Sequence, residues 1–358
     1  MASTYADTAL LDAVMTAKAN DTFQSFETKG SVYGALDAGI DGMRRLLPAG
    51  TLKALKEADQ QPLKIDVFKK EDEGADTVFA CTGSGDGATA RVPLVFQGFV
   101  EKFSLSDGEM RYNKYSYQEM FRMRWAEKMK ALYKRIDAYI VSILEANYSA
   151  GAGTSFTLFN DAFQVPLDEY DLASNRAALW LNKVKADMAK NDFSGDNIHI
   201  LGESNMMAVA SSMLNQGQGN ETNLGWQFQG VTRNYTNRIA NNLGIYATGY
   251  VFEKGAFGVF DWVDPRFREG KVAGEHIWTS FVDPRYGMTF GVKSQRTCAD
   301  NTSIFAGQAM GADFEENWQI GIQIASPLAY DSDGGSFIYK YELDNDNSIL
   351  SGSGSYSA

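Results

Sequence analysis

The longest regular pattern of apolar and polar positions runs from Ser116 to Tyr148 and contains no glycine or proline. Apolar residues recur there at alternating spacings of four and three, which places them on one face of a helix. Ser116 and Glu119 form a capping-box pair that fixes the start. About 32 residues at 1.5 Å each give a rod of roughly 48 Å. We predict a spine helix whose core face consists of Trp125, Met129, Leu132, Ile136, Tyr139 and Ile143.

The rest of the chain mixes helical and strand-like patterns, which predicts an α+β protein. Helical stretches are expected near 8–18 and at 34–59, the second broken at Pro48. Runs rich in β-branched and aromatic residues at 64–68 and 91–106 predict strands that frame a long hairpin or extended loop. Further helices are expected at 171–192 and 204–214, and further strands at 197–201, 244–252, 257–263, 286–292 and 317–325.

The loop between the first two predicted strands carries three closely spaced glycines, Gly83, Gly85 and Gly87. A phosphate-binding P-loop needs Gly-Lys-Ser/Thr after its glycines, and this chain has no such triplet there. A Rossmann turn needs a helix to follow, but the next residues include Pro93 and read as a strand. We therefore predict a hairpin tip in which glycine supplies backbone freedom, with no cofactor bound.

No catalytic or metal-binding pattern emerges. The only histidines, His199 and His276, lie in no paired-ligand spacing, and the only cysteines, Cys81 and Cys298, suggest neither a zinc site nor a disulfide framework. Acidic stretches at 331–335 and 344–348 lack the calcium-loop ligand pattern and are interpreted as solvated turns. We expect no catalytic residues, no metal ligands and no cofactor, and we expect that the protein is not an enzyme.

Composition narrows the class of protein. The chain has 358 residues, 44% hydrophobic and 22% charged, so it can bury a large core, and two domains are the default expectation. The net charge of −12 argues against a protein whose main function is to bind nucleic acid tightly, although such a protein could still enclose nucleic acid. Neither a signal peptide nor a long apolar run for a transmembrane helix is expected.

The order of these elements resembles the major capsid proteins of tailed bacteriophages with the Hong Kong 97-type fold. That resemblance covers nearly the whole chain and rests on element order, because the family has no tight signature motif. It implies an N-terminal arm at 1–35, an extended loop at 62–104, and a peripheral domain formed by 36–61, 105–169 with its spine helix at 116–148, and returning strands at 322–350. It also implies a mixed axial domain at 170–321 and a flexible tail at 351–358.

The resemblance implies a structural protein that self-assembles into pentamers and hexamers of an icosahedral shell around a double-stranded DNA genome. Implied partners are copies of the same chain and scaffolding and portal proteins, with no membrane and no sequence-specific DNA binding. The protein would be assembled in the host cytoplasm and located in the virion. An arm and a glycine-tipped loop have little core of their own and become stable by lying on neighbours, which fits an assembly.

Three other classes stay open. An encapsulin-like nanocompartment shell shares the fold and encloses enzymes, and a neighbouring cargo gene would distinguish it from a phage capsid. An α/β cofactor-dependent enzyme would need a catalytic constellation. A β-rich binding protein would be monomeric.

Residues 262–267 and 281–286 are similar in sequence, and each contains Asp-Pro-Arg, which is typical of a turn. We expect Arg266 or Arg285 to face a neighbouring subunit from an axial-domain loop; the alternative is an exposed turn arginine that contributes almost nothing. Together with Gly83, Gly85 and Gly87, these arginines are the predicted assembly residues.

Overall fold

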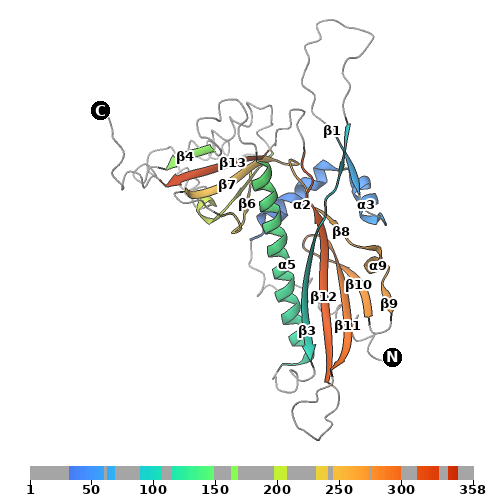
Figure 1. The fold of residues 1–358 in the computed structure, drawn as a ribbon. Coiled ribbons are helices and arrows are strands. Elements are labelled where there is room, and N and C mark those ends of the chain that lie inside the picture. The colour runs from blue at the N-terminus through green and yellow to red at the C-terminus, as the bar shows by residue number, and fades with distance from the viewer. Residues whose placement is uncertain are drawn as a thin grey trace, which may run out of the picture.

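A computed structural model describes residues 32–59, 63–68, 89–106, 115–148, 163–167, 197–207, 231–240, 245–273, 276–299, 313–329 and 338–345. Within these residues the fold is α+β, as predicted. A long helix, α5 (Tyr117–Asn147), lies against two separate sheets. A third, two-stranded sheet projects from the body beside two short helices, α2 (Gly34–Leu46) and α3 (Ala49–Glu57) (Figure 1).

The larger sheet, called here the spine sheet, is antiparallel throughout and packs one face on α5. Its strands follow the order β3 (Gln97–Ser106), β12 (Asp313–Ala325), β11 (Thr289–Ala299), β10 (His276–Val282) and β9 (Lys271–Ala273), and β8 (Phe260–Trp262) also pairs with β12. Figure 1 shows α5 running alongside β3 for most of its length. The short helix α9 (Pro265–Arg268) links β8 to β9.

The second sheet, called here the mixed sheet, contains parallel and antiparallel pairs. Its strands follow the order β4 (Phe163–Leu167), β13 (Ile338–Asn345), β7 (Ile245–Glu253), β5 (Ile198–Gly202) and β6 (Val231–Tyr235). The pairs β13–β4 and β5–β6 are parallel, and the two pairs made by β7 are antiparallel. In Figure 1 this sheet lies across one end of α5.

Strand pairing divides the chain differently from the expected domain ranges. Strands β10, β11 and most of β12 fall within the range expected for the axial domain, yet they pair with β3 under the spine helix. Strand β13 was expected to return to the peripheral domain, yet it lies in the mixed sheet beside β7. Sheet membership is decided by long-range strand pairing, which local sequence does not reveal.

The predicted spine helix is confirmed, including its start. Ser116 is the N-cap: its hydroxyl accepts from the Glu119 backbone N–H at 3.3 Å, and the Glu119 carboxylate accepts from the Ser116 N–H at 2.8 Å. These hydrogen bonds and the closeness of Arg122 lower the pKa of Glu119. The expected ending signals, Gly151 and Gly153, lie outside the described residues.

The predicted buried face is correct over its first four positions and wrong over its last two. Trp125, Met129, Leu132 and Ile136 are buried, whereas Tyr139 and Ile143 are only half-buried. Ile140 and Leu144 are fully buried in their place. A repeat of 3.5 residues drifts by roughly 20° per heptad from a straight helix, so the buried face moves to the next residue along.

Aromatic side chains form the core between α5 and the spine sheet. Phe121 lies 4.9 Å from Trp318 between ring centroids, and Phe103 stacks on Trp318 at 6.3 Å. Trp125 reaches Phe281 on β10 at 5.2 Å. Offset and edge-to-face pairs of this kind stabilise a core beyond their area of burial, so the N-terminal half of α5 is firmly held.

Helix α2 packs closely on the segment between β7 and β8 because one of its faces is lined by small residues. A side chain at Gly42 would place its Cβ 2.1 Å from the Phe257 carbonyl oxygen, and one at Gly34 would place it 2.5 Å from the Tyr235 carbonyl oxygen. The Val259 N–H donates to the Gly39 carbonyl at 3.0 Å. Only glycine permits this approach at Gly34 and Gly42.

Ile136→Ala tests the burial of the spine. Ile136 has no exposed surface, so truncation leaves a cavity, and we expect a loss of about 2–5 kcal/mol in the free energy of unfolding. The measurement is urea denaturation of the dissociated subunit. Ile143→Ala is the matched control on the same helix, and it should cost clearly less because Ile143 is half-buried. Equal losses in the two variants would contradict the assigned face.

Candidate functional site

The described residues offer no metal site. No group of three or more His, Cys, Asp or Glu side chains that could hold a metal ion occurs among them. No helix in this part of the chain is long and apolar enough to cross a membrane. The candidate functional features are therefore surfaces and joints: a buried carboxyl at the meeting point of the two sheets, the Asp-Pro-Arg turns, the projecting ribbon, and the open face of the spine sheet.

His199 occupies a structural position in β5. It is buried, it stacks on Phe252 with ring centroids 5.6 Å apart, and its Nδ1 lies 2.8 Å from the Asn234 side-chain nitrogen. Burial lowers the pKa of His199 to about 4, although Asp41 acts in the opposite direction. The imidazole is therefore neutral near pH 7, and its ring packs in the core beside Phe252.

Asp137 is the joint between the spine helix and the mixed sheet. Its carboxylate accepts the Leu36 N–H of α2 at 3.0 Å and the Thr236 hydroxyl, just beyond β6, at 2.5 Å. A bridge between Tyr33 and Thr236 completes the contact between α2 and the end of β6. One fully buried carboxyl thus joins three segments that are about 100 residues apart in sequence.

Burial raises the pKa of Asp137 to about 6, while the hydrogen bonds from Thr236 and Leu36 and the charge of Arg238 oppose the rise. A buried carboxyl with a displaced pKa in a polar cluster is a candidate functional group, because its ionisation changes the energy of the joint. The sequence pattern pointed to the apolar stripe and missed this residue. Its only signal was an acidic residue beside the predicted core position Ile136.

A second set of contacts ties the C-terminal end of α5 to the mixed sheet. Glu145 accepts from the Lys340 ammonium at 2.8 Å and from the Tyr250 hydroxyl. Lys340 is buried and lies 5.2 Å from the centre of the Tyr148 ring. At this end the helix is therefore attached to β13 by an ion pair and to β7 by a hydrogen bond.

Both Asp-Pro-Arg segments form turns, as predicted. Asp264 is the N-cap of α9 and accepts the Arg266 N–H at 2.9 Å. Its carboxylate also receives the Arg266 guanidinium in a two-pronged pair at 3.0 Å, which lowers the pKa of Asp264 and raises that of Arg266. The side chain of Arg266 is 71% exposed, so this pair contributes little to stability.

The second turn is held by a buried carboxylate. Asp283 accepts the Tyr133 hydroxyl of α5 at 2.7 Å and the N–H groups of Arg285 at 3.4 Å and Tyr286 at 3.3 Å. Gly287 closes the turn with a φ of 66°. Arg285 is exposed, and its guanidinium lies 4.9 Å from the centre of the Tyr286 ring. Both arginines lie beside strands of the spine sheet.

Arg268, which the sequence reasoning did not select, has the structural role in the first turn. Its guanidinium donates to the Lys56 carbonyl at 2.9 Å and to the Ala58 carbonyl at 2.8 Å. These oxygens lie at the C-terminal end of α3, where a cation is favoured. The Trp262 indole N–H adds a third contact to Ala58 at 3.1 Å. The partners are more than 200 residues apart, which no local pattern reveals.

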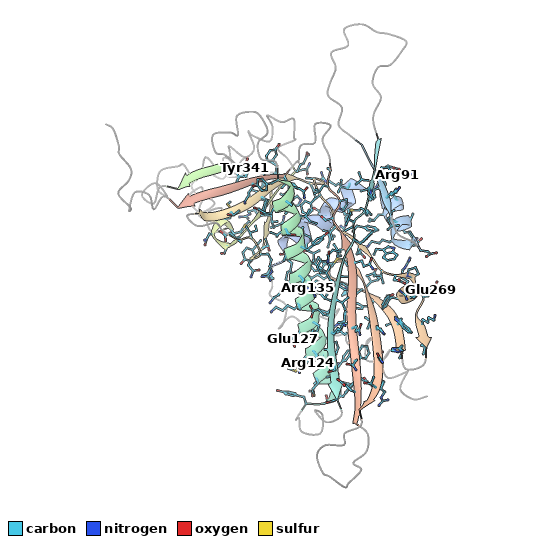
Figure 2. The ribbon with its side chains drawn as sticks, in the orientation of Figure 1. Arg91, Arg124, Glu127, Arg135, Glu269 and Tyr341 are labelled. Carbon is cyan, nitrogen blue, oxygen red and sulfur yellow. The ribbon has the colours of Figure 1, made fainter. Side chains whose placement is uncertain are left out.

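The predicted strands of the extended loop pair as an antiparallel ribbon, β1 (Lys64–Phe68) with β2 (Thr89–Pro93). Its described buried residues lie at the base: Leu63, Ile65 and Leu94, which pack with β8. Higher up, Arg91 and Asp66 make an exposed ion pair at 3.0 Å. Arg91 is labelled there in Figure 2. The candidate glycines Gly83, Gly85 and Gly87 lie outside the described residues.

The face of the spine sheet that is turned away from α5, called here the open face, is only partly covered among the described residues. Two glycines lie side by side on this face: Gly291 on β11 pairs with Gly321 on β12, and they are called here the glycine row. Gly321 in turn pairs with Val100 on β3. Together with Gly98, Trp262 and Phe267 they line a shallow hollow. Val100 is 48% exposed there, and Val282 on β10 is 57% exposed. This apolar, indented surface is a candidate contact face.

The pH dependence of unfolding tests the Asp137 joint. The native pKa of about 6 lies above the unfolded value near 3.8, so the native state holds the proton longer and its stability falls as pH rises through this window. The loss should reach about 3 kcal/mol. Asp137→Asn keeps an acceptor for Leu36 and removes the titration, so its stability relative to wild type should rise between about pH 4 and pH 7.

The comparison with Asp137→Asn is needed because His199 titrates in the same range with the opposite sign. Its lowered pKa means that its contribution increases as pH rises. Urea unfolding of both proteins at several pH values isolates the carboxyl, and Asp66→Asn on the exposed ribbon is the control. A difference between wild type and Asp137→Asn that stays flat with pH would refute the assignment.

Comparisons with known proteins find similarity in fold only. No family model matches the chain, and no curated protein matches it. Among solved structures, a chain of Mycobacterium phage Che8 is 11% identical with a TM-score of 0.46, covering 83% of this chain and 89% of its own. The mature capsid of bacteriophage PhiM1 is 9% identical with a TM-score of 0.45, over 80% and 83%. The capsid of Ralstonia phage GP4 is 8% identical with a TM-score of 0.43, over 81% and 86%.

Proposed function

We propose that this chain is a major capsid protein, a structural protein that assembles into pentamers and hexamers of an icosahedral shell enclosing the double-stranded DNA of a tailed bacteriophage. The observation that carries the proposal is the β1–β2 ribbon, which extends from the body and whose described buried residues lie at its base. The ribbon fits the order of elements in the family that the sequence resembles: arm, extended loop, spine helix and second sheet.

The ribbon gains stability from a surface to lie on, and we expect a neighbouring subunit to supply that surface. A two-stranded ribbon alone is marginally stable in water, and its exposed Arg91–Asp66 pair adds little. Twenty residues, 69–88, separate the two strands. A copy of the same chain is the natural partner, because a closed symmetric assembly buries one segment of every subunit on the next.

The open face of the spine sheet offers such a partner surface. Val100 and Val282 expose apolar area beside the glycine row, and Val95, next to the ribbon, is 76% exposed. Apolar area of this kind favours protein contact over solvent. We assign the spine sheet with α5 to the peripheral domain of the capsid fold and the mixed sheet to its axial domain.

Further parts of the proposal follow from the resemblance. Scaffolding and portal proteins are the expected partners, and the protein is assembled in the host cytoplasm and located in the virion. Arg266 and Arg285 remain candidate contacts between subunits.

Assembly of the purified chain tests the proposal. Negative-stain microscopy and light scattering of the recombinant protein, with its scaffold coexpressed, should show capsomers or closed shells. A variant in which a short turn replaces residues 69–88 should fold as a subunit, because the described core residues Leu63, Ile65 and Leu94 lie outside the replaced segment, and it should form no shells. A wild-type protein that stays monomeric at high concentration with scaffold present would refute the proposal.

Gly85→Val tests the assigned role of the loop glycines. If their role is conformational, the variant subunit should melt like wild type and form fewer or irregular shells, because a β-branched residue lacks the backbone freedom of glycine. Gly50→Ala is the control, since a Cβ at Gly50 meets nothing within 4 Å. A rise in melting temperature with ATP or NAD, together with normal shells from Gly85→Val, would indicate a nucleotide site instead.

A further inference from the structure

The part of α5 that is not packed on the spine sheet is strongly basic. Within twelve residues it carries the set Arg124, Lys128, Lys130, Lys134 and Arg135, called here the basic stripe. Glu127 is the only acidic residue of α5 within this stretch. The whole chain has a net charge of −12, so the stripe is a local reversal of sign. Figure 2 labels Arg124, Glu127 and Arg135 along the helix.

Nearby carboxylates neutralise only part of this charge. Lys128 and Arg135 share one partner, Glu101 on β3, at 3.9 Å and 2.8 Å. Arg124 lies 3.8 Å from Glu127, and both side chains are largely exposed. Lys130 and Lys134 are exposed and make no ion pair within the described part of the chain. The stripe therefore keeps an excess of positive charge facing solvent.

The length of the stripe is sufficient to span several phosphates of a DNA duplex. Arg124 and Arg135 are separated by about 16 Å along the helix axis, and double-stranded DNA carries one charge per roughly 1.7 Å of its axis. The opposite face of α5 is packed on the spine sheet, so the helix cannot insert into a major groove and contact base edges. Contact is thus limited to the backbone, which fixes position without reading sequence.

We propose that the basic stripe contacts the phosphates of enclosed double-stranded DNA, so that the α5 face of the subunit lines the shell interior and the open face of the spine sheet faces outward. The inference rests on the proposed function and adds the orientation of the subunit and the surface that meets the genome. Five cations in an acidic protein give contact that is weak, independent of sequence and sensitive to salt.

Duplex DNA fits the stripe better than an acidic protein does. A protein partner needs a central apolar or aromatic anchor, whereas the middle of the stripe carries Ala131 between Lys130 and Lys134. The exposed apolar residues Tyr115 and Met123 lie in a hollow at one end of the stripe, beside Arg124 and Lys130. Lys134 and Arg135 extend beyond that hollow, as contact with a long polyanion requires.

The test compares salt dependence. A short, labelled, mixed-sequence duplex is titrated with the full chain at increasing NaCl, and binding is read by fluorescence anisotropy. In Lys130→Gln/Lys134→Gln, the slope of log affinity against log salt should fall in magnitude by about 1.8, because each lost phosphate contact removes about 0.9. The control, Lys53→Gln/Lys271→Gln, removes two exposed lysines outside α5 and should keep the wild-type slope.

Two outcomes overturn the inference. The first is a stripe variant whose salt slope equals that of the control. The second is displacement of the labelled duplex by polyglutamate at a lower charge concentration than unlabelled duplex requires, which would assign the stripe to an acidic protein. Thermal melting confirms that both variants fold. Shell formation is scored separately by microscopy. Wild-type shells with an unchanged variant slope overturn only this inference. A wild-type chain that forms no shells overturns the proposed function, and with it the orientation in a shell, whatever DNA binding the subunit shows.

Discussion

Burial of one face of α5 is the constraint on which the remaining structure depends. The helix presents Trp125 and Leu132 to the aromatic core of the spine sheet, and farther along it presents Ile140 and Leu144, which are also buried. Because an α-helix does not repeat every 3.5 residues, its buried face rotates along the rod. The same helix can therefore contact two sheets, and its polar contacts at Asp137 and Glu145 lie where the second sheet begins.

Polar groups hold this fold at its joints, and apolar packing holds it elsewhere. Asp137, Asp283 and Asp261 are all buried carboxyls that link segments distant in sequence. Asp261, for example, accepts the Thr289 N–H at 2.9 Å and pairs with Lys56 at 2.5 Å. A buried polar group is costly unless every partner is in place, so such groups fix one arrangement of helix and sheet where apolar contact alone would tolerate sliding.

Local features of this fold could be predicted from sequence, and long-range ones could not. The capping box at Ser116, the strand 64–68 and the two Asp-Pro-Arg turns depend on neighbours within a few residues. The placement of β12 beside β3, and of β13 beside β7, depends on pairings across much of the chain. Arg268 and Asp137 were missed for the same reason: their partners lie 212 and 101 residues away.

The rigidity of α5 also makes it a lever. Tyr117 lies 20 residues before Asp137, which is about 30 Å along the axis. A tilt of about 5° at the Asp137 joint would move the start of the helix by about 3 Å if the rod stays straight. The phenol of Tyr117 bonds to Glu316 on β12, so the spine sheet would swing with it. A small rotation at one buried carboxyl thus becomes a displacement comparable to a side chain's length at the far edge of the subunit.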